Sequence, residues 1–394
     1  MLHFLHLFAL DGAVKLSVLG LHVSIPLVLS GLLLPFSVNR RSVSLLKTYL
    51  KAEFFLVLFI LYVILSLLWS SDSASGGRLI LQYILPSVVL YAFLITHSQL
   101  LHNSRFWEVM LFLFILSGYI QVFLYYLFDY QVDFAGYGRS FYDNTFGYRM
   151  RGFFQEPNWY GVFGFFSVAN YAVFCKLENK KMHPFLLIGL AAVFILSCNR
   201  IIILLFLGII IVLNVDIKKR IHVLLVLFML LLGPSIFLMG KDTTGSVRMG
   251  SLIRTYNYVR QNFTPLHIIT GKGWGSWAGI SYNQKIGHVY SRGDDVVGKR
   301  VVGGRSDSSE YTMTFVEAGL IGFMLIALDA ILIFRNCFRF ENTQVSRLAF
   351  LFLSSILCIA FFYPIYSFIP YMISYLSLRS FVKLKYINEA RLLR

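Results

Sequence analysis

Long apolar blocks separated by short polar connections make up most of the chain, and one long polar stretch, Lys241–Glu310, interrupts them. A helix needs roughly 17–25 mostly apolar residues to cross a bilayer, and blocks near this length recur along the sequence. The predicted spans are Leu16–Phe36, Phe54–Trp69, Leu79–Thr96, Trp107–Phe128, Trp159–Phe174, Phe185–Ser197, Ile201–Val215, Ile221–Met239, Tyr311–Phe334, Ala349–Phe362 and Ile365–Leu376. A shorter piece, Leu2–Leu10, is a candidate half-span. The pattern therefore predicts an all-α, polytopic membrane helix bundle of about 11–12 transmembrane helices.

The charges of the connections predict the orientation of this bundle. If the spans alternate, the most basic connections fall on one side, which the positive-inside rule makes cytoplasmic. They are Asn39–Lys51, Lys176–His183, Asp216–Arg220, Arg335–Arg347 and the tail after Leu378. The opposite, external side receives Ser71–Arg78, Asp129–Pro157, the turn Cys198–Arg200 and Lys241–Glu310. Three parts follow: residues 1–240 as an N-terminal bundle, 241–310 as a long external loop, and 311–394 as C-terminal spans with a basic cytoplasmic tail.

Composition agrees with a membrane protein. The 394 residues are 57% hydrophobic and only 14% charged, a balance that an ordinary soluble domain does not need. Lysine and arginine exceed the acids by 35 − 19 = 16, and in a membrane protein much of such an excess is a topology signal that does not imply nucleic acid. The four cysteines form no Cys-x-x-Cys pair, and no cleavable signal peptide, phosphate-binding glycine loop or internal repeat is visible.

The long loop carries more basic than acidic residues although it is predicted to be external. Long loops cross the membrane regardless of charge, so topology does not explain this excess. Either function or attraction to lipid headgroups is the cause. Within the loop, Ser246–Phe263 has the pattern of an amphipathic helix carrying Arg248, Arg254 and Arg260, and Pro265 with Gly271, Gly273 and Gly275 turns the chain. A helix lying on the membrane surface is the alternative interpretation of this segment.

Three further segments carry candidate chemistry at the outer membrane edge. In the segment 149–161, Arg149 and Arg151 suit a phosphate or pyrophosphate group, whereas an interfacial anchor with a helix cap is the alternative. Arg200, between two apolar blocks, is either functional or reaches to the surface. Asp307 and Glu310 are candidate general bases or a capping pair, and Glu317 lies about two turns inside a span.

Taken in order, four motifs make the chain resemble the O-antigen polymerase and ligase superfamily of bacterial inner-membrane glycosyltransferases. They are the Arg-Gly-Phe-Phe-Gln-Glu-Pro-Asn-x-x-Gly segment at 151–161, the Ser-x-x-Arg turn at 197–200, the external helix with Arg248 followed by Pro265 and Gly271-x-Gly-x-Gly275, and the Tyr-x5-Glu-x-Gly-Leu-x-Gly run at 311–322. The resemblance covers about Arg149–Gly322. The ligase branch has a histidine just before the last run, where this chain has Asp307-Ser-Ser-Glu310, and this departure favours the polymerase branch.

The resemblance implies a GT-C-like bundle that polymerises undecaprenyl-pyrophosphate-linked oligosaccharide units on the periplasmic face of the inner membrane, without metal or other cofactor. Fixed guanidinium groups would stabilise the pyrophosphate leaving group. Arg151, Arg200, Arg248 and Arg254 are assigned to it. Asp307 or Glu310 would accept the hydroxyl proton, and Glu317 would orient an arginine. The sugar-binding or supporting residues are Arg149, Glu156, Asn158, Arg305 and Tyr311.

Expected partners are the lipid-linked donor and acceptor, membrane lipids and, as a candidate, a chain-length regulator protein, but no nucleic acid. A ligase that transfers the glycan to lipid A-core is one alternative. A flippase for the same lipids is another, although the candidate cations cluster on one face and do not line a path across the membrane. A scaffold whose basic loop binds anionic lipid is the third.

Overall fold

The computed structural model describes residues 15–18, 21–24, 31–32, 35, 40–97, 101–129, 142–143, 147–148, 150, 152, 154, 157–197, 202–203, 205–207, 243–283, 310–340, 342–362 and 373–383. This part of the chain is mostly helical. Its helices are α2 (Arg40–Ala52), α3 (Phe54–Ser66), α4 (Ser73–Leu79), α5 (Leu85–Thr96), α7 (Ser104–Phe128), α8 (Pro157–Leu177), α9 (Pro184–Leu196), α12 (Thr243–Asn262), α13 (Pro265–Thr270), α14 (Ser276–Asn283), α15 (Glu310–Cys337) and α16 (Thr343–Phe362). Residues 373–383 are also helical.

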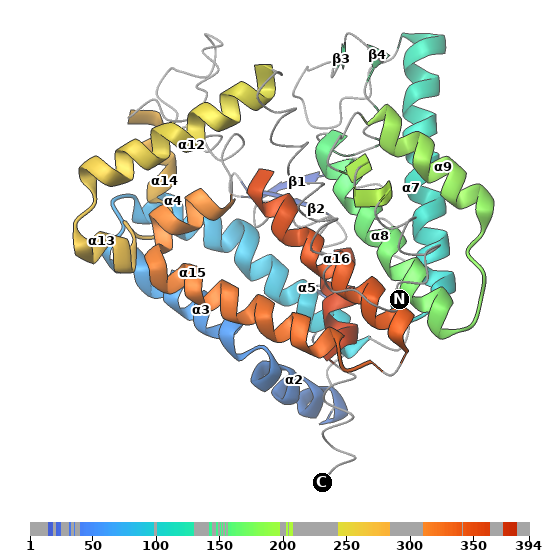
Figure 1. Cartoon of the computed structure of the whole chain (residues 1–394), viewed down its shortest axis with the longest axis horizontal. Helices are drawn as coiled ribbons and strands as arrows, with labels where there is room; N and C mark the ends of the chain where they lie inside the picture. Colours follow the sequence, from blue (N-terminus) through green and yellow to red (C-terminus); the bar gives the residue numbers. More distant parts are fainter. Residues whose placement is uncertain are drawn as a thin grey trace.

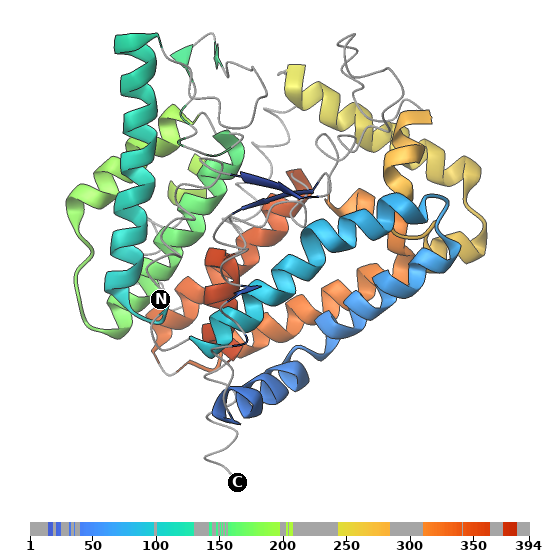
Figure 2. The same ribbon diagram turned by 180° about the vertical axis from the view of Figure 1, so that it is seen from behind.

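Short elements complete the fold. The 3-10 helix η2 (Leu67–Trp69) extends α3, and the π-helix η3 (Ile80–Ile84) joins α4 to α5, so that α4, η3 and α5 form one rod, seen from behind in Figure 2. Strands β1 (Lys15–Val18) and β2 (Leu21–Ser24) pair antiparallel, as do β3 (Tyr142–Asp143) and β4 (Gly147–Tyr148).

Three of the described helices are long and apolar enough to cross a membrane: Ser104–Phe128, Asn158–Leu177 and Tyr311–Cys337. Shorter apolar helices cover Phe54–Trp69, Ser87–Thr96, Pro184–Leu196 and Gln344–Leu357. All seven fall on predicted spans. The coarse prediction of a mostly helical protein is therefore confirmed for the described residues, three of whose helices have the length and composition to cross a membrane.

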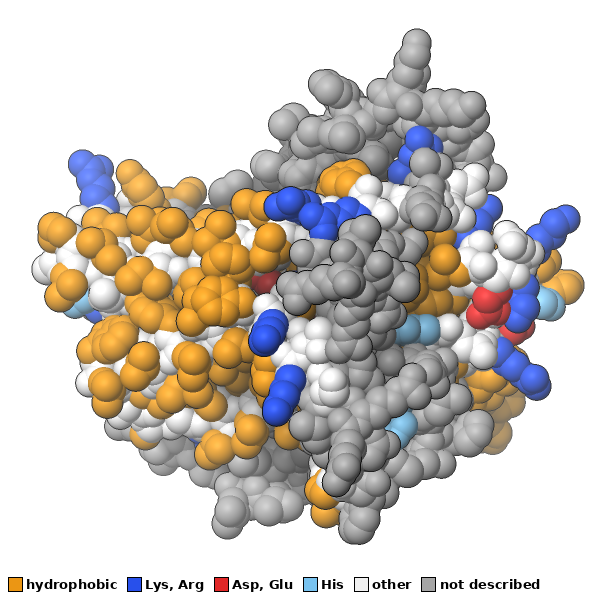
Figure 3. Space-filling view, turned by 90° about the horizontal axis from the view of Figure 1, so that it is seen from below, with side chains coloured by type: hydrophobic (Ala, Val, Ile, Leu, Met, Phe, Trp, Pro, Cys, Tyr) orange, Lys and Arg blue, Asp and Glu red, His pale blue; other side chains and the backbone are white. Residues whose placement is uncertain are grey.

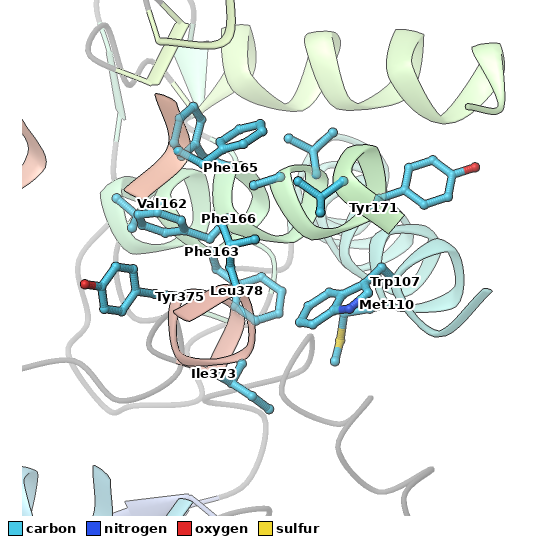
Figure 4. Close-up of a cluster of buried hydrophobic side chains, with 14 of the residues drawn as sticks. Trp107, Met110, Val162, Phe163, Phe165, Phe166, Tyr171, Ile373, Tyr375 and Leu378 are labelled. Carbon is cyan, nitrogen blue, oxygen red and sulfur yellow. The ribbon is translucent and has the colours of Figure 1, made fainter. Parts of the chain in front are cut away.

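The larger apolar core is built around α8, which is buried along nearly its whole length. Helices α7, α9 and α16 pack against it, and Figure 4 shows its phenylalanines between Trp107 of α7 and Tyr375 and Leu378 of the segment 373–383. A helix that is apolar on nearly every side suits such a central, buried position.

A smaller core lies between α3 and α15. Phe59 and Val63 of α3 pack with Leu79, Trp274 and Ala318. The opposite faces of these helices expose large apolar side chains, among them Leu61 and Ile64 of α3 and Phe323 and Met324 of α15. Figure 3, seen from below, shows a broad hydrophobic surface. A continuous apolar surface of this extent indicates contact with lipid or another apolar partner.

The connections predicted on opposite sides also lie apart in the structure. Figure 1 shows α2 and the turn between α15 and α16 along the lower edge, whereas α12 and the β3–β4 ribbon lie along the upper edge. Helices α3 and α15 run side by side between these regions, from α13 and α14 down toward α2.

The structure differs from the prediction in three places. The predicted span Leu16–Phe36 begins as the antiparallel β1–β2 pair, in which Val18 and Val23 are residue types that favour strands. Two predicted connections, Asn39–Lys51 and Ser71–Arg78, contain α2 and α4, and the carboxylate of Asp72 caps α4 by accepting from the Ser75 N–H. The candidate half-span Leu2–Leu10 and the span Ile221–Met239 lie outside the described residues, as does most of Ile201–Val215.

Candidate functional site

Helix α15 is broken at Gly319, whose φ of 62° and ψ of −161° are not helical. A break leaves backbone carbonyl groups without their helical partners, and inside a protein these must be paired. Here the glycine-rich loop after α13 supplies the donors. The N–H of Lys272 donates to the carbonyl of Val316 (2.8 Å), and the N–H of Gly273 donates to the carbonyl of Glu317 (2.9 Å). We call this junction of residues 271–277 with residues 316–319 the clasp.

The side chain of Glu317 holds the same junction. It is fully buried, and its Oε1 accepts from the backbone N–H groups of Gly275 and Trp277, both at 3.1 Å. These two N–H groups lie at the start of α14, so the carboxylate caps that helix from α15. Glu317 therefore fixes the path of the loop through its backbone.

Helix α3 holds the loop from the other side. The Tyr62 hydroxyl donates to the carbonyl of Thr270 (2.8 Å), and the Ser70 hydroxyl donates to the carbonyl of Trp274 (2.8 Å). The Ser66 hydroxyl oxygen accepts from the N–H of Trp274 (3.0 Å), whose ring meets Phe59 edge-on. The loop is thus bonded to α3, to Ser70 directly after η2, and to α15.

Glycine is required at four positions of the clasp. Gly271, Gly273, Gly275 and Gly319 all have positive φ, between 62° and 89°. A Cβ atom at any of them would run into backbone atoms of the facing segment. Both the conformation and the close approach exclude larger residues, which explains the spacing Gly-Lys-Gly-Trp-Gly in physical terms.

Helix α12 leads into the clasp and carries the loop arginines. The amphipathic helix predicted at 246–263 is present as Thr243–Asn262. Its buried side is formed by Thr255, Tyr258 and Val259, next to Trp277, Met313 and Val316. Ile253 and Tyr256 are exposed beside Arg254 and Arg260, although an amphipathic pattern predicts them on the apolar face, because the helix packs through a neighbouring face.

The predicted site residues are described to different extents. Tyr311 donates from its hydroxyl to the carbonyl of Leu357 (2.7 Å), Asn158 is half-buried in the first turn of α8, and Arg254 is exposed. Arg248 lies in α12 and Glu310 begins α15, but their side chains are not among those described. Outside the described residues lie Arg149, Arg151, Glu156, Arg200, Arg305 and Asp307. Of the three predicted catalytic residues, Glu317 is the one whose side-chain burial and hydrogen bonds the structure describes.

A second cluster of ionised side chains lies at the other end of α3 and α15, and the sequence analysis did not identify it. The guanidinium of Arg379 binds Asp329 through two hydrogen bonds (Nη1 to Oδ2, 2.7 Å; Nη2 to Oδ1, 2.8 Å) and binds Glu53 through Nε (3.0 Å to Oε1) and Nη2. Lys383 donates to the carbonyl of Ala52 (2.6 Å) and lies 3.4 Å from Glu53. We call these four residues, Glu53, Asp329, Arg379 and Lys383, the ion-pair network.

All four residues of the ion-pair network are buried. Burial opposes the ionisation of Glu53, but the charge and hydrogen bonds of Arg379 outweigh this and lower the pKa of the Glu53 carboxyl below its ordinary value. The hydroxyl of Tyr91 also donates to Glu53. The prediction that the basic residues after Leu378 form a tail is therefore wrong for Arg379 and Lys383, which neutralise buried carboxylates. The sequence signal that could have predicted this network is the presence of two acids, Glu53 and Asp329, within or beside apolar blocks, because such acids usually have a buried basic partner.

No group of three or more histidine, cysteine, aspartate or glutamate side chains that could hold a metal ion occurs within the described ranges. The known proteins add no assignment, because no family model and no curated sequence matches the chain. The function has to be argued from the clasp, the arginines of α12 and the sequence motifs themselves.

Proposed function

We propose that this protein polymerises undecaprenyl-pyrophosphate-linked oligosaccharide repeat units into O-antigen or a related polysaccharide, on the outer face of a bacterial inner membrane. The observation that carries the proposal is the clasp. It joins two of the four motifs behind the resemblance, Gly271-x-Gly-x-Gly275 and the run at 311–322, through backbone and side-chain hydrogen bonds. Motifs about 40 residues apart that depend on each other sterically are more specific than either motif alone.

In this proposal the clasp supplies rigidity and the arginines supply charge. Glu317, bonded to the Gly275 and Trp277 N–H groups, is a positioning residue that fixes the loop following α12 and α13. Arg248 and Arg254 of α12, together with Arg151 and Arg200, would stabilise the negative charge that develops on the pyrophosphate leaving group. Asp307 or Glu310, just before the first turn of α15 or in it, would take the proton of the attacking sugar hydroxyl.

The first experiment is reconstitution of the purified protein with synthetic lipid-linked repeat units. A ladder of lengthened glycans on the polyprenyl lipid is the expected product. A single transfer to lipid A-core would favour the ligase, and movement of unextended units across the bilayer would favour the flippase. The absence of all three would favour the scaffold.

Lysine variants separate a pyrophosphate clamp from a lipid anchor. Lysine keeps the positive charge that an anchor needs but lacks the planar, two-pronged donor set of arginine. Arg151→Lys, Arg200→Lys, Arg248→Lys and Arg254→Lys should each reduce elongation, by up to about 10²–10³. Arg260→Lys is the matched control, since Arg260 is exposed on the same helix, and it should stay within a few-fold of the parent. Equal activity of all five variants would contradict the clamp.

The ion-pair network gives the flippase a specific observation in its favour. Candidate cations that cluster on one face disfavour a flippase, yet Arg379 and Lys383 are buried elsewhere in the structure. Both cations are paired with carboxylates, so that the network has no net charge and can serve to hold helices together. Polymerisation therefore remains our proposal. The translocation arm of the reconstitution decides between them.

A further inference from the structure

We propose that residues 265–277, comprising α13 and the glycine-rich loop, form a re-entrant segment that enters the outer leaflet of the membrane and presents Leu266, Ile268 and Ile269 to lipid acyl chains. The charge and hydropathy pattern predicts the whole of Lys241–Glu310 outside the membrane. The inference rests on the premise of the proposed function that α3 and α15 cross a bilayer, with the clasp at their outer ends.

The depth of the segment follows from its partners. Gly271 lies against Gly319, the residue at which α15 is broken. Tyr62, which binds the carbonyl of Thr270, lies roughly 10 Å before the end of the apolar helix Phe54–Trp69. The hydrogen bond from Tyr62 therefore places the end of α13 beside α3, about two turns before that helix ends.

At this depth α13 exposes apolar side chains. Leu266 is 65% exposed, Ile269 47% and Ile268 42%. The nearby surface of α15 is also apolar, with Leu320, Ile321, Phe323 and Met324 exposed, and α13 packs directly on α15. Exposing three such side chains of a six-residue helix to water would be unfavourable in free energy. Lipid that contacts the apolar surface of α15 would also cover these side chains of α13.

The backbone N–H groups of the loop meet the condition that a membrane places on irregular structure. Non-helical backbone at membrane depth is tolerated where its polar groups are paired within the protein. The N–H groups of residues 271–277 donate to protein acceptors at every position that carries one: to His267, Val316, Glu317, the Ser66 hydroxyl, the Glu317 carboxylate, Gly273 and the Glu317 carboxylate again. A loop in water would not need this complete pairing.

The segment also brings a cation to the membrane edge. Lys272 is half-buried, with its Nζ 5.5 Å from the centre of the Phe263 ring. Arg260 is exposed at the end of α12, just before the segment. We expect these two cations at the level of the lipid phosphates, above the acyl contacts of Leu266 and Ile269.

Single cysteines in a chain whose four own cysteines are replaced by alanine test the inference. The test positions are Leu266 and Ile269, the water-facing references are Gln261 and Asn262, and the lipid-facing references are Phe323 and Met324, all exposed. In sealed membrane vesicles with the clasp side outward, a membrane-impermeant maleimide should label 261 and 262 faster than 266 and 269 by at least an order of magnitude, because thiolates form poorly in apolar surroundings. Spin labels at 266 and 269 should collide frequently with oxygen and rarely with a water-soluble nickel chelate, like those at 323 and 324.

The references separate the two proposals. Labelling of 266 and 269 as fast as 261, with 323 and 324 still protected, overturns the re-entrant segment and leaves the membrane premise standing. Fast labelling of 323 and 324 as well overturns both. Protection of 266 and 269 from oxygen and nickel alike would mean that protein covers them, and that outcome also overturns the inference.

Discussion

The two ends of the α3–α15 pair bury carboxylates by different means. At the clasp, Glu317 is held by backbone N–H groups at the start of a helix. In the ion-pair network, beyond the break and further along α15, Asp329 and Glu53 share the guanidinium of Arg379. The partners described for the first carboxylate are backbone dipoles, and those of the other two include the formal charge of Arg379, so we expect the two regions to respond differently to substitution.

Removing one member of a buried ion pair leaves its partner charged and without compensation, whereas removing all members together need not be unfavourable. A carboxylate bonded to N–H groups can be replaced by a neutral amide that keeps its accepting oxygen. The network is therefore expected to be sensitive to the loss of any one charge, and the clasp to the loss of an acceptor.

The largest effect is expected for Arg379→Met, which leaves Glu53 and Asp329 buried without their cation. Its cost in the free energy of unfolding should be about 3–5 kcal/mol, measured by denaturation of the purified protein in detergent. Arg335→Met, at an exposed position of α15, is the matched control and should change stability by less than about 0.5 kcal/mol.

The combined variant Glu53→Leu/Asp329→Leu/Arg379→Met/Lys383→Met sharpens this prediction. Because no charge remains buried there, it should recover most of the stability lost in Arg379→Met. A quadruple variant less stable than Arg379→Met would show that the network is more than a balance of buried charges. A cost below about 1 kcal/mol for Arg379→Met would contradict the buried network itself.

A smaller effect is expected at Glu317, where the comparison is between Leu and Gln. Glu317→Leu leaves the N–H groups of Gly275 and Trp277 without this acceptor and should cost about 2–4 kcal/mol. Glu317→Gln keeps Oε1 as an acceptor and should cost roughly 1 kcal/mol, with polymer formation largely retained. If Gln abolishes elongation while the protein stays as stable as the parent, Glu317 acts through its charge in the reaction.

The smallest effect is expected from alanine at single glycines. Gly275→Ala places a Cβ against the backbone of Gly76 at a φ of 89°, and should cost about 1–3 kcal/mol. Gly77→Ala and Gly279→Ala are the controls, since nothing lies within 4 Å of a Cβ there, and alanine in a helix should stabilise by up to about 1 kcal/mol. Equal melting temperatures for the three variants would contradict the close approach at the clasp.

The sequence by itself determined the helical, membrane-like character of the chain and the positions of most described helices. Apolar block length is a local property, so α7, α8, α9 and α16 could be placed from composition alone. The amphipathic helix and the turn at Pro265 followed from equally local signals. The hairpin at Lys15–Ser24 could not be distinguished from a span, because a short apolar run fits a strand as well as a helix.

The tertiary structure decided which residues meet. The break of α15 at Gly319 occurs because Gly271 lies against it, and the sequence shows two glycines without their contact. In the sequence, Arg379 and Lys383 look like part of a basic tail. In the structure, they bind Glu53, more than 300 residues earlier, and Arg379 also binds Asp329, 50 residues earlier. Pairing of buried charge and close approach of backbones depend on three-dimensional neighbours, and a single sequence contains the partners without showing which of them meet.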